Sequence, residues 1–316
     1  IVASWAGVGS LMNFRTLALN NGAVAAVIWA IFNTLACILF GVAVEYLPYV
    51  RKIMQTKVMF YFIGLLTVFQ TWTQMSGIRE IFADTIIGEI GGTIIAYATC
   101  IAFIIILLKK GMIRNVLTDS ASWVIVYGLL LLVVVSSLIT TGKFNDVPIG
   151  ETAEGVKTGL YKGFLLLPGP FTYPYYYALY DYNSKNEDGT KQISIKRSFI
   201  LAGIMFGVYM ALAAILTWVN FSPVLNVLKA VLITIVAISS ISTYIYSEYL
   251  VFGKKMGVAI DILTVGLWCV LIPLGVMGIW TLMSEIRVYI ICAVVLFAIG
   301  KRIYDKAKGV NMNEDS

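Results

Sequence analysis

Long apolar runs recur along the whole chain, and they constrain its fold more than any other feature of the sequence. Runs rich in Leu, Ile and Val follow one another from end to end, and each reaches the roughly 20 residues that a helix needs to cross a bilayer. Of the 316 residues, 59% are hydrophobic and 13% are charged. A soluble domain is nearer to roughly 45–50% apolar and 25% charged. The sequence therefore predicts an all-α integral membrane protein without a separate soluble domain.

Basic residues mark the loops between these runs. Most of the 23 Lys and Arg residues gather in every second loop, as at Arg51, Lys52, Lys109 and Lys110. The positive-inside rule then places these loops and both ends of the chain in the cytoplasm, beneath a plasma membrane and in the first instance a bacterial inner membrane. The alternation fits ten spans, over about 1–19, 22–48, 57–80, 84–108, 112–138, 156–181, 197–219, 224–250, 256–282 and 286–304.

Ten spans divide into five and five, and an odd number per half inserts the second half upside down relative to the first. This is the arrangement of inverted-repeat transporters, whose binding sites lie where the first helix of each half is broken. Breakers occur at both positions here: Gly7 and Gly9 in the first span, and Pro168-Gly169-Pro170 in the sixth. We expect one transmembrane core with broken first and sixth helices, its repeats covering about 1–138 and 156–304, followed by a cytoplasmic tail over 305–316.

A hydroxyl-rich stretch interrupts the apolar run that precedes Phe252. Residues 237–247 read A-I-S-S-I-S-T-Y-I-Y-S, and at 3.6 residues per turn Ser239, Ser242 and Thr243 share one helix face. Such hydroxyls can bond to a neighbouring helix, or they can offer oxygen ligands to a small hard cation. The sequence leaves both uses open at this point.

Several functional classes have little support in the sequence. The chain has no His, and its four Cys are scattered singly within apolar runs without metal-ligand spacing. No nucleophile is paired with a base, so an enzyme is not expected. The net charge of +6 follows the topology of the loops, and nucleic acid is not an expected partner. The expected partners are membrane lipid and a small-molecule solute, and the oligomeric state stays open.

Three stretches carry a resemblance to a known family. They are residues 3–22, A-S-W-A-G-V-G-S-L-M-N-F-R-T-L-A-L-N-N-G, residues 111–122, G-M-I-R-N-V-L-T-D-S-A-S, and the hydroxyl-rich stretch. In this order they resemble the first core helix, the start of the fifth and the eighth of the sodium/solute symporter family, a branch of the APC superfamily with the five-plus-five leucine-transporter fold. The chain looks like a short, divergent member, because Ser122 replaces the family's Gln and the usual flanking helices are missing.

The resemblance implies a sodium site between the first and eighth core helices. Its ligands would be the carbonyl oxygens of Ala3, Ala6 and Val236 and the hydroxyls of Ser239 and Ser240. Oxygens without formal charge suit a monovalent cation that must bind and then leave. The resemblance also links Asp119 to cation coupling. Capping of a helix at the cytoplasmic surface is the alternative role for Asp119.

The resemblance also places a substrate pocket beside the sodium ion. Its walls would be aromatic with some hydroxyls and one amide, which suits a small neutral or zwitterionic organic solute. Interfacial anchoring is the alternative role for such aromatic residues. The residues expected to line the pocket are Trp5, Ser10, Trp29, Trp72, Gln74, Phe171, Thr172 and Tyr173.

The predicted function is therefore sodium-coupled symport by alternating access. Two alternatives stay open. One is proton coupling through Asp119 in place of sodium. The other is a non-transporting membrane sensor or regulatory protein on the same fold, which the short chain and the departures from the family's motifs would suit.

Overall fold

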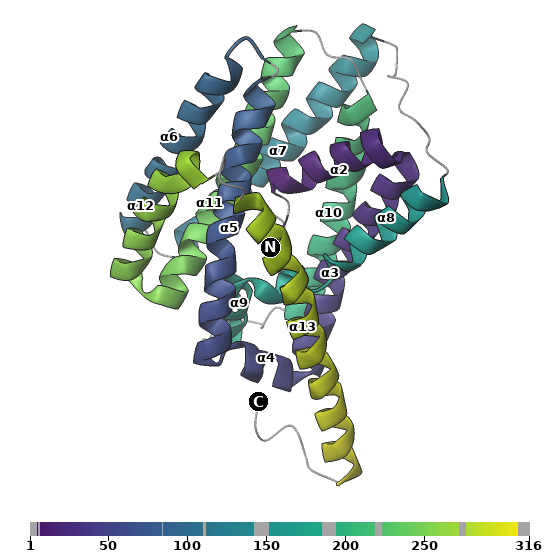
Figure 1. The fold of residues 1–316 in the computed structure, drawn as a ribbon, viewed down its shortest axis with the longest axis vertical. Coiled ribbons are helices and arrows are strands. Elements are labelled where there is room, and N and C mark those ends of the chain that lie inside the picture. Colours follow the sequence, from purple (N-terminus) through teal and green to yellow (C-terminus); the bar gives the residue numbers. More distant parts are fainter. Residues whose placement is uncertain are drawn as a thin grey trace.

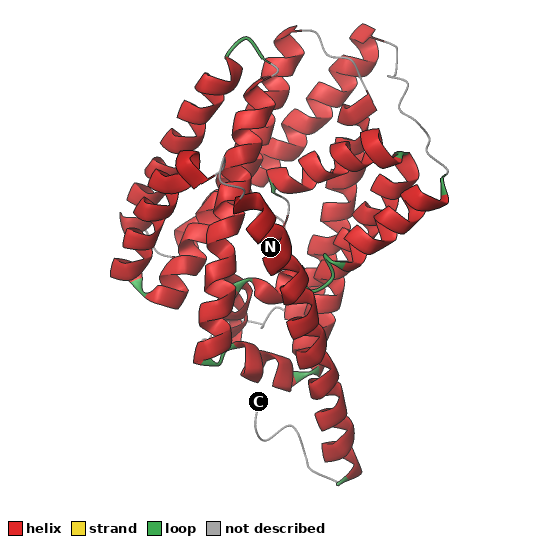
Figure 2. Cartoon of the chain, in the orientation of Figure 1, coloured by secondary structure: helices red, strands yellow, loops and turns green. Residues whose placement is uncertain are grey.

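The computed structural model describes residues 5, 7–83, 85–109, 112–141, 152–184, 194–218, 223–271 and 276–308, and every regular element in this part is helical (Figures 1 and 2). The helices are α2 (Val8–Asn21), α3 (Ala23–Tyr46), α4 (Pro48–Met54), α5 (Lys57–Ala83), α6 (Gly88–Lys109), α7 (Met112–Thr141), α8 (Ala153–Phe164), the 3-10 helix η1 (Gly169–Thr172), α9 (Pro174–Ser184), α10 (Ile195–Trp218), α11 (Pro223–Phe252), α12 (Lys254–Leu271) and α13 (Val276–Ala307).

Six of these helices are long and apolar enough to cross a membrane. A seventh would be the pair α4 and α5, whose axes differ by 76° across a short break. These helices fit an integral membrane protein, as predicted, whereas the count of ten spans stays a prediction. The six qualifying segments are Ala23–Tyr46, Gly88–Ile106, Ser120–Ile139, Ile195–Ala214, Val224–Phe252 and Leu282–Ala307.

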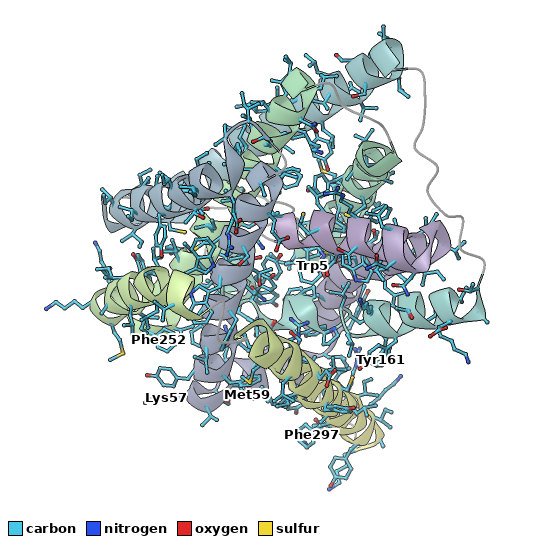
Figure 3. The ribbon with its side chains drawn as sticks, turned by 45° about the horizontal axis from the view of Figure 1, so that its top comes forward. Trp5, Lys57, Met59, Tyr161, Phe252 and Phe297 are labelled. Carbon is cyan, nitrogen blue, oxygen red and sulfur yellow. The ribbon has the colours of Figure 1, made fainter. Side chains whose placement is uncertain are left out.

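The outward faces of the helices are apolar, as lipid contact requires. Ile90 of α6, Ile139 of α7 and Phe297 of α13 are 80%, 78% and 60% exposed, and Figure 3 shows Phe297 at the periphery. Polar side chains lie inside instead, among them Thr67 of α5 and Ser240 of α11, which are fully buried. Soluble monomers rarely expose so much apolar surface, so this pattern agrees with membrane insertion.

Both interruptions expected from the sequence occur. Gly7 has an extended backbone (φ −88°, ψ 171°) immediately before α2. In the segment expected to be the sixth span, α8 ends at Phe164, a turn and η1 follow, and α9 begins only at Pro174. The P-G-P sequence explains this break, because each Pro lacks a backbone donor and clashes with a preceding helical turn.

The structure differs from the sequence-based spans near the C-terminus. We expected a span over 256–282 and another over 286–304, but α12 ends at Leu271 and α13 begins at Val276. The last turns assigned to the ninth span therefore belong to one long final helix. Pro273 lies between the two helices in the sequence, and a Pro disfavours helix at the residue before it. The short helix α4, with Pro48 at its first position, was also not expected.

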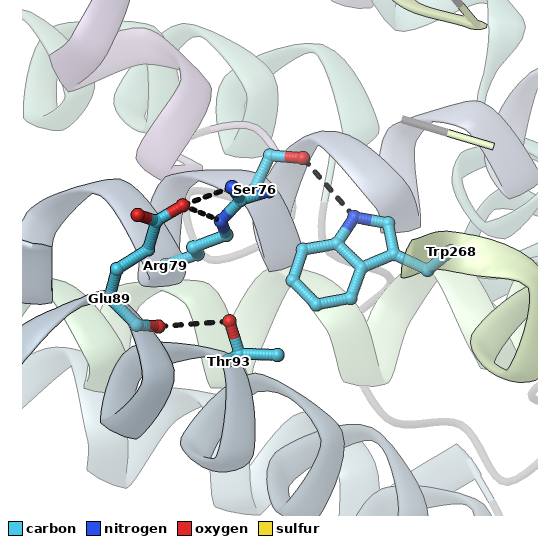
Figure 4. Close-up of polar contacts among 5 residues, drawn as sticks. All are labelled: Ser76, Arg79, Glu89, Thr93 and Trp268. Carbon is cyan, nitrogen blue, oxygen red and sulfur yellow. Dashed lines mark hydrogen bonds and ion pairs between the residues drawn. The ribbon is translucent and has the colours of Figure 1, made fainter. Parts of the chain in front are cut away.

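Helices α5 and α11 pack against each other along the middle of the molecule, and α3 packs against α10 and α8 (Figure 1). Helices α2 and α8 cross the direction of α5 (Figures 1 and 3). Polar contacts join α5 to its neighbours: Arg79 forms an ion pair with Glu89 of α6, and Trp268 Nε1 of α12 donates to Ser76 Oγ over 3.2 Å (Figure 4). The two helix breaks thus lie inside a frame of paired long helices.

Candidate functional site

A cavity of 340 Å³ lies where the interrupted segments meet α3, α5 and α13. Its volume is in the range of pockets for small organic molecules. Side chains and backbone from both halves of the chain line it, and most of them are polar or aromatic. The lining residues are Trp5, Gly7, Gly9, Ser10, Asn13, Trp29, Asn33, Gln70, Thr73, Gln74, Lys162, Leu165, Leu166, Tyr173, Tyr244, Ser284 and Arg287.

The first break is held in place by an amide from α5. The N–H of Val8, at the start of α2, donates to Gln74 Oε1 over 2.7 Å, and both residues are buried. A Cβ on Gly7 would lie 2.7 Å from the Gln74 amide atoms, so a larger residue at this position would have to displace the amide that accepts from Val8. Gln74 therefore replaces the intrahelical acceptor that the first turn of α2 lacks.

An aromatic wall joins the first break to the second. Trp5 Nε1 donates to the carbonyl oxygen of Asn33 over 3.1 Å, and the Trp5 ring meets the Tyr173 ring edge-on at 5.7 Å between centroids. The hydroxyls of Tyr173 and Tyr244 are 3.3 Å apart. These side chains are buried, and Figure 3 places Trp5 at the centre of the helices. The wall is therefore rigid and carries hydroxyls at one end.

Two cationic side chains line the opposite part of the cavity. Arg287 of α13 is 5% exposed and its Nη2 donates to the carbonyl oxygen of Leu165 over 3.3 Å. Lys162 comes from the last turn of α8. None of the described lining residues is acidic. Lys162 is exposed, whereas Arg287 is a buried charge within an apolar helix, and such residues are rare and typical of functional sites.

Three further lining residues have buried polar atoms without a hydrogen-bond partner in the protein: Asn33 Oδ1, Gln70 Oε1 and Ser284 Oγ. Buried polar atoms are nearly always satisfied, because an unmade hydrogen bond is costly. Atoms of this kind gathered around one cavity are typical of a site that binds a polar ligand. Two of them accept hydrogen bonds, and the hydroxyl can donate or accept.

Five of the eight residues predicted to contact substrate line this cavity: Trp5, Ser10, Trp29, Gln74 and Tyr173. The other three lie elsewhere. Trp72 Nε1 donates to the carbonyl oxygen of Thr264 on α12 over 2.8 Å, and Thr172 Oγ1 donates to that of Gly169 over 2.7 Å. Phe171 borders a second, wholly apolar cavity of 530 Å³ between α3 and α13.

Sequence reasoning did not identify Asn33, Gln70, Lys162, Ser284 or Arg287. Two signals were available. Arg287 is a charge within an apolar span, and Gln70 lies one helical turn before Gln74 on α5, which puts both on one helix face. Neither signal identifies the segment that packs against this face of α5. Only the packing of the long helices supplies that information.

The predicted sodium ligands on α11 are buried together. Val236, Ser239 and Ser240 are at most 1% exposed, and Ser240 Oγ donates to the carbonyl oxygen of Val236 over 3.3 Å. Two of the predicted ligand oxygens are thus adjacent. Ala3, Ala6 and the side chain of Asp119 lie outside the described residues, so the sodium site and the role of Asp119 stay predictions. The described residues contain no group of three or more His, Cys, Asp or Glu that could hold a metal ion.

No protein-family model matches the chain, and a search of curated proteins finds none similar to it.

Proposed function

We propose that this chain is a secondary transporter that carries a small organic solute across a plasma membrane together with sodium, by alternating access. The observation that carries the proposal is the polar cavity at the meeting point of two interrupted helical segments. Interrupted backbone at membrane depth is tolerated where it lines a cavity, and transporters place their binding sites there.

The packing of the helices supports a five-plus-five inverted repeat of ten spans. Exchanging the two halves would exchange α2 with α8 and α9, α3 with α10, α5 with α11, and α6 with α12. Contacts come in matching pairs under this exchange: α5 packs on α6 as α11 packs on α12, and α2 packs on α10 as α8 packs on α3. Helix α2 also packs on α5 as α9 packs on α11.

The cavity favours a solute with a carboxylate, within the small neutral or zwitterionic class that the sequence suggested. Arg287 and Lys162 supply positive charge, and an Arg side chain can bind a carboxylate through two parallel hydrogen bonds. Asn33, Gln70 and Ser284 can receive the polar groups of the solute. The rings of Trp5 and Trp29 cover its apolar part. A zwitterionic solute satisfies all three features.

Sodium coupling draws on the hydroxyl-rich part of α11. Ser240 Oγ lies 3.3 Å from the carbonyl oxygen of Val236, so two of the expected ligand oxygens are adjacent in a buried position. Helix α11 packs against α2, which begins at the first break. A cation between the two helices would link sodium binding to the shape of the cavity, with both ends of the chain in the cytoplasm.

The test is sodium-dependent thermal stabilisation of the purified protein, compared with potassium or choline at equal ionic strength. A ligand that binds only the folded state at about a hundred times its Kd adds about 2.7 kcal/mol to the free energy of unfolding. We expect a sodium-specific shift that Ser239→Ala and Ser240→Ala abolish. Ser247→Ala is the matched control, because this buried hydroxyl donates to Thr243 on the same helix and is not a predicted ligand.

Uptake by proteoliposomes then separates transport from sensing. A sodium gradient that drives accumulation of a bound carboxylate supports the symporter. Binding of sodium and solute without uptake would identify a non-transporting sensor. A sodium shift that is equal in Ser239→Ala, Ser240→Ala and the control would remove the sodium site from α11.

A further inference from the structure

Two carboxyl groups are buried side by side away from the cavity. Glu248 lies near the end of α11 and Asp261 lies on α12, and they are 0% and 2% exposed. The chain turns between the two helices at Gly253, whose φ of 78° is open to glycine without strain. This tight turn folds α12 back on α11 and sets the two side chains against each other.

Among the described residues, the side chains that act most strongly on the pair are uncharged. Thr71 of α5 lies against Glu248, Cys100 of α6 lies near both carboxyl groups, and Tyr249 lies beside Asp261. The basic residues nearest along the chain, Lys254 and Lys255, are exposed at the turn, whereas both carboxyl groups are buried. The titratable groups that face the pair are therefore the Cys100 thiol and the Tyr249 phenol.

The polar atoms of the pair lack well-formed hydrogen bonds. Both Oε atoms of Glu248, Oδ2 of Asp261 and the hydroxyl of Tyr249 make no hydrogen bond of good geometry, although these groups and Thr71 lie within reach of one another. Elsewhere on α11 the buried hydroxyls of Ser242 and Ser247 donate to backbone carbonyls over 2.8 Å. The fully buried and unsatisfied Glu248 side chain is thus an exception in its own helix, and it faces Asp261.

The charge of the two carboxyl groups determines which partner can complete their hydrogen bonds. Two adjacent carboxylates cannot both remain ionised in an apolar interior, because desolvation and mutual repulsion oppose the second charge. One proton removes the repulsion, and the resulting carboxylic acid can donate to the neighbouring carboxylate. A multivalent cation needs more oxygen ligands for its coordination than two carboxyl groups and a few hydroxyls provide.

We propose that Glu248 and Asp261 form a proton-binding site in which the pair holds a single shared proton. The reaction is reversible protonation of one carboxylate, with the proton exchanged with the cytoplasm near the α11–α12 turn. Glu248 follows Ser240 by eight residues, about 12 Å along the helix, so this site is distinct from the predicted sodium site. Thr71 precedes Gln74 by one helical turn on α5, and the proton site therefore adjoins the helix that holds the first break.

The proposal stands independently of transport, and infrared spectroscopy of the purified protein tests it directly. At neutral pH an ordinary Glu or Asp is ionised. We expect the wild-type protein to show the carbonyl stretch of a protonated carboxylic acid at neutral pH. Glu248→Gln and Asp261→Asn, which keep the side-chain size, should each remove it. Glu89→Gln is the matched control, because that carboxylate is half exposed and paired with Arg79.

Two results would overturn the proposal. One is a wild-type spectrum without a protonated carboxylic acid at neutral pH. The other is a band that persists unchanged in both pair variants, which would assign it to another group. A thermal shift with a metal cation that either pair variant abolishes, in protein that lacks the band, would identify a cation site instead. If either variant fails to fold, the wild-type spectrum alone still decides against the proposal when the band is missing.

Discussion

The indole ring of Trp5 lies directly on Gly169. A Cβ on Gly169 would overlap Cη2 of the indole. Trp5 precedes the first helix break and Gly169 lies within the second, so the two interruptions are in contact although they are far apart in the sequence. The absence of a side chain at Gly169 is what allows the ring to lie there.

Gly169→Ala should destabilise the protein by about 1–3 kcal/mol, because the added methyl group meets a rigid ring that cannot turn away. Gly128→Ala is the matched control. Gly128 lies within α7 with no atom near its virtual Cβ, so alanine there should raise stability by up to about 1 kcal/mol. Chemical denaturation in detergent measures both. Equal stability of Gly169→Ala and the wild-type protein would contradict the packing described here.

Gln74→Met should also destabilise the protein, by about 1–3 kcal/mol, because the buried N–H of Val8 loses its acceptor. Gln74→Glu keeps an acceptor oxygen at the same place and serves as the comparison. Hydrogen exchange of the first turn of α2 reports the effect locally. The explanation fails if α2 exchanges equally slowly in the methionine variant.

Arg287→Met should weaken binding of a carboxylate solute by roughly ten- to a hundredfold, since a hydrogen bond to a charged group contributes about 1.5–3 kcal/mol. Arg287→Lys should retain part of the affinity because the charge remains. A thermal-shift screen of small carboxylates, followed by titration of the best ligand and its methyl ester, measures this. An ester that binds as tightly as the acid would argue against recognition of a carboxylate.

Glu89→Gln should change the free energy of unfolding by less than about 1 kcal/mol. The ion pair between Arg79 and Glu89 is partly solvated, with side chains 35% and 54% exposed, and solvent screens such pairs. Melting curves at low and high salt are the measurement. A large loss of stability at both salt concentrations would show that this contact fastens α5 to α6 more strongly than its exposure suggests.

The sequence predicts best those elements that are determined by residues within the element itself. Apolar length identifies α3, α7, α10 and α11, and the breakers Gly7 and Pro168-Gly169-Pro170 predict both interruptions. The error near the C-terminus has a local cause as well. The apolar run continues across Pro273, so hydropathy alone joined the end of α12 to the beginning of α13.

The candidate site was less predictable, because its chemistry depends on contacts between distant segments. Asn33 and Arg287 look isolated in the sequence, and only the packing of α3 and α13 brings them to one cavity. Glu248 and Asp261 were likewise unremarked, although a carboxyl group within an apolar span is itself a signal of function. The pairing of the two became visible only with the tight turn at Gly253.

Among the described residues, helix α13 has different neighbours from the other long helices. It packs mainly on α4 and η1, whereas α7, its counterpart if the halves are exchanged, packs on α10 and α11. Near its C-terminal end, Asp305 accepts hydrogen bonds from Tyr49 and Lys301, over 2.7 and 2.6 Å. Toward its other end, Glu285 accepts a hydrogen bond from Tyr161 of α8 over 3.2 Å, and Arg287 donates to the carbonyl oxygen of Leu165 over 3.3 Å. The buried cation of the cavity is thus tied to the segment that follows α8, so any shift of that segment would also move the positive charge.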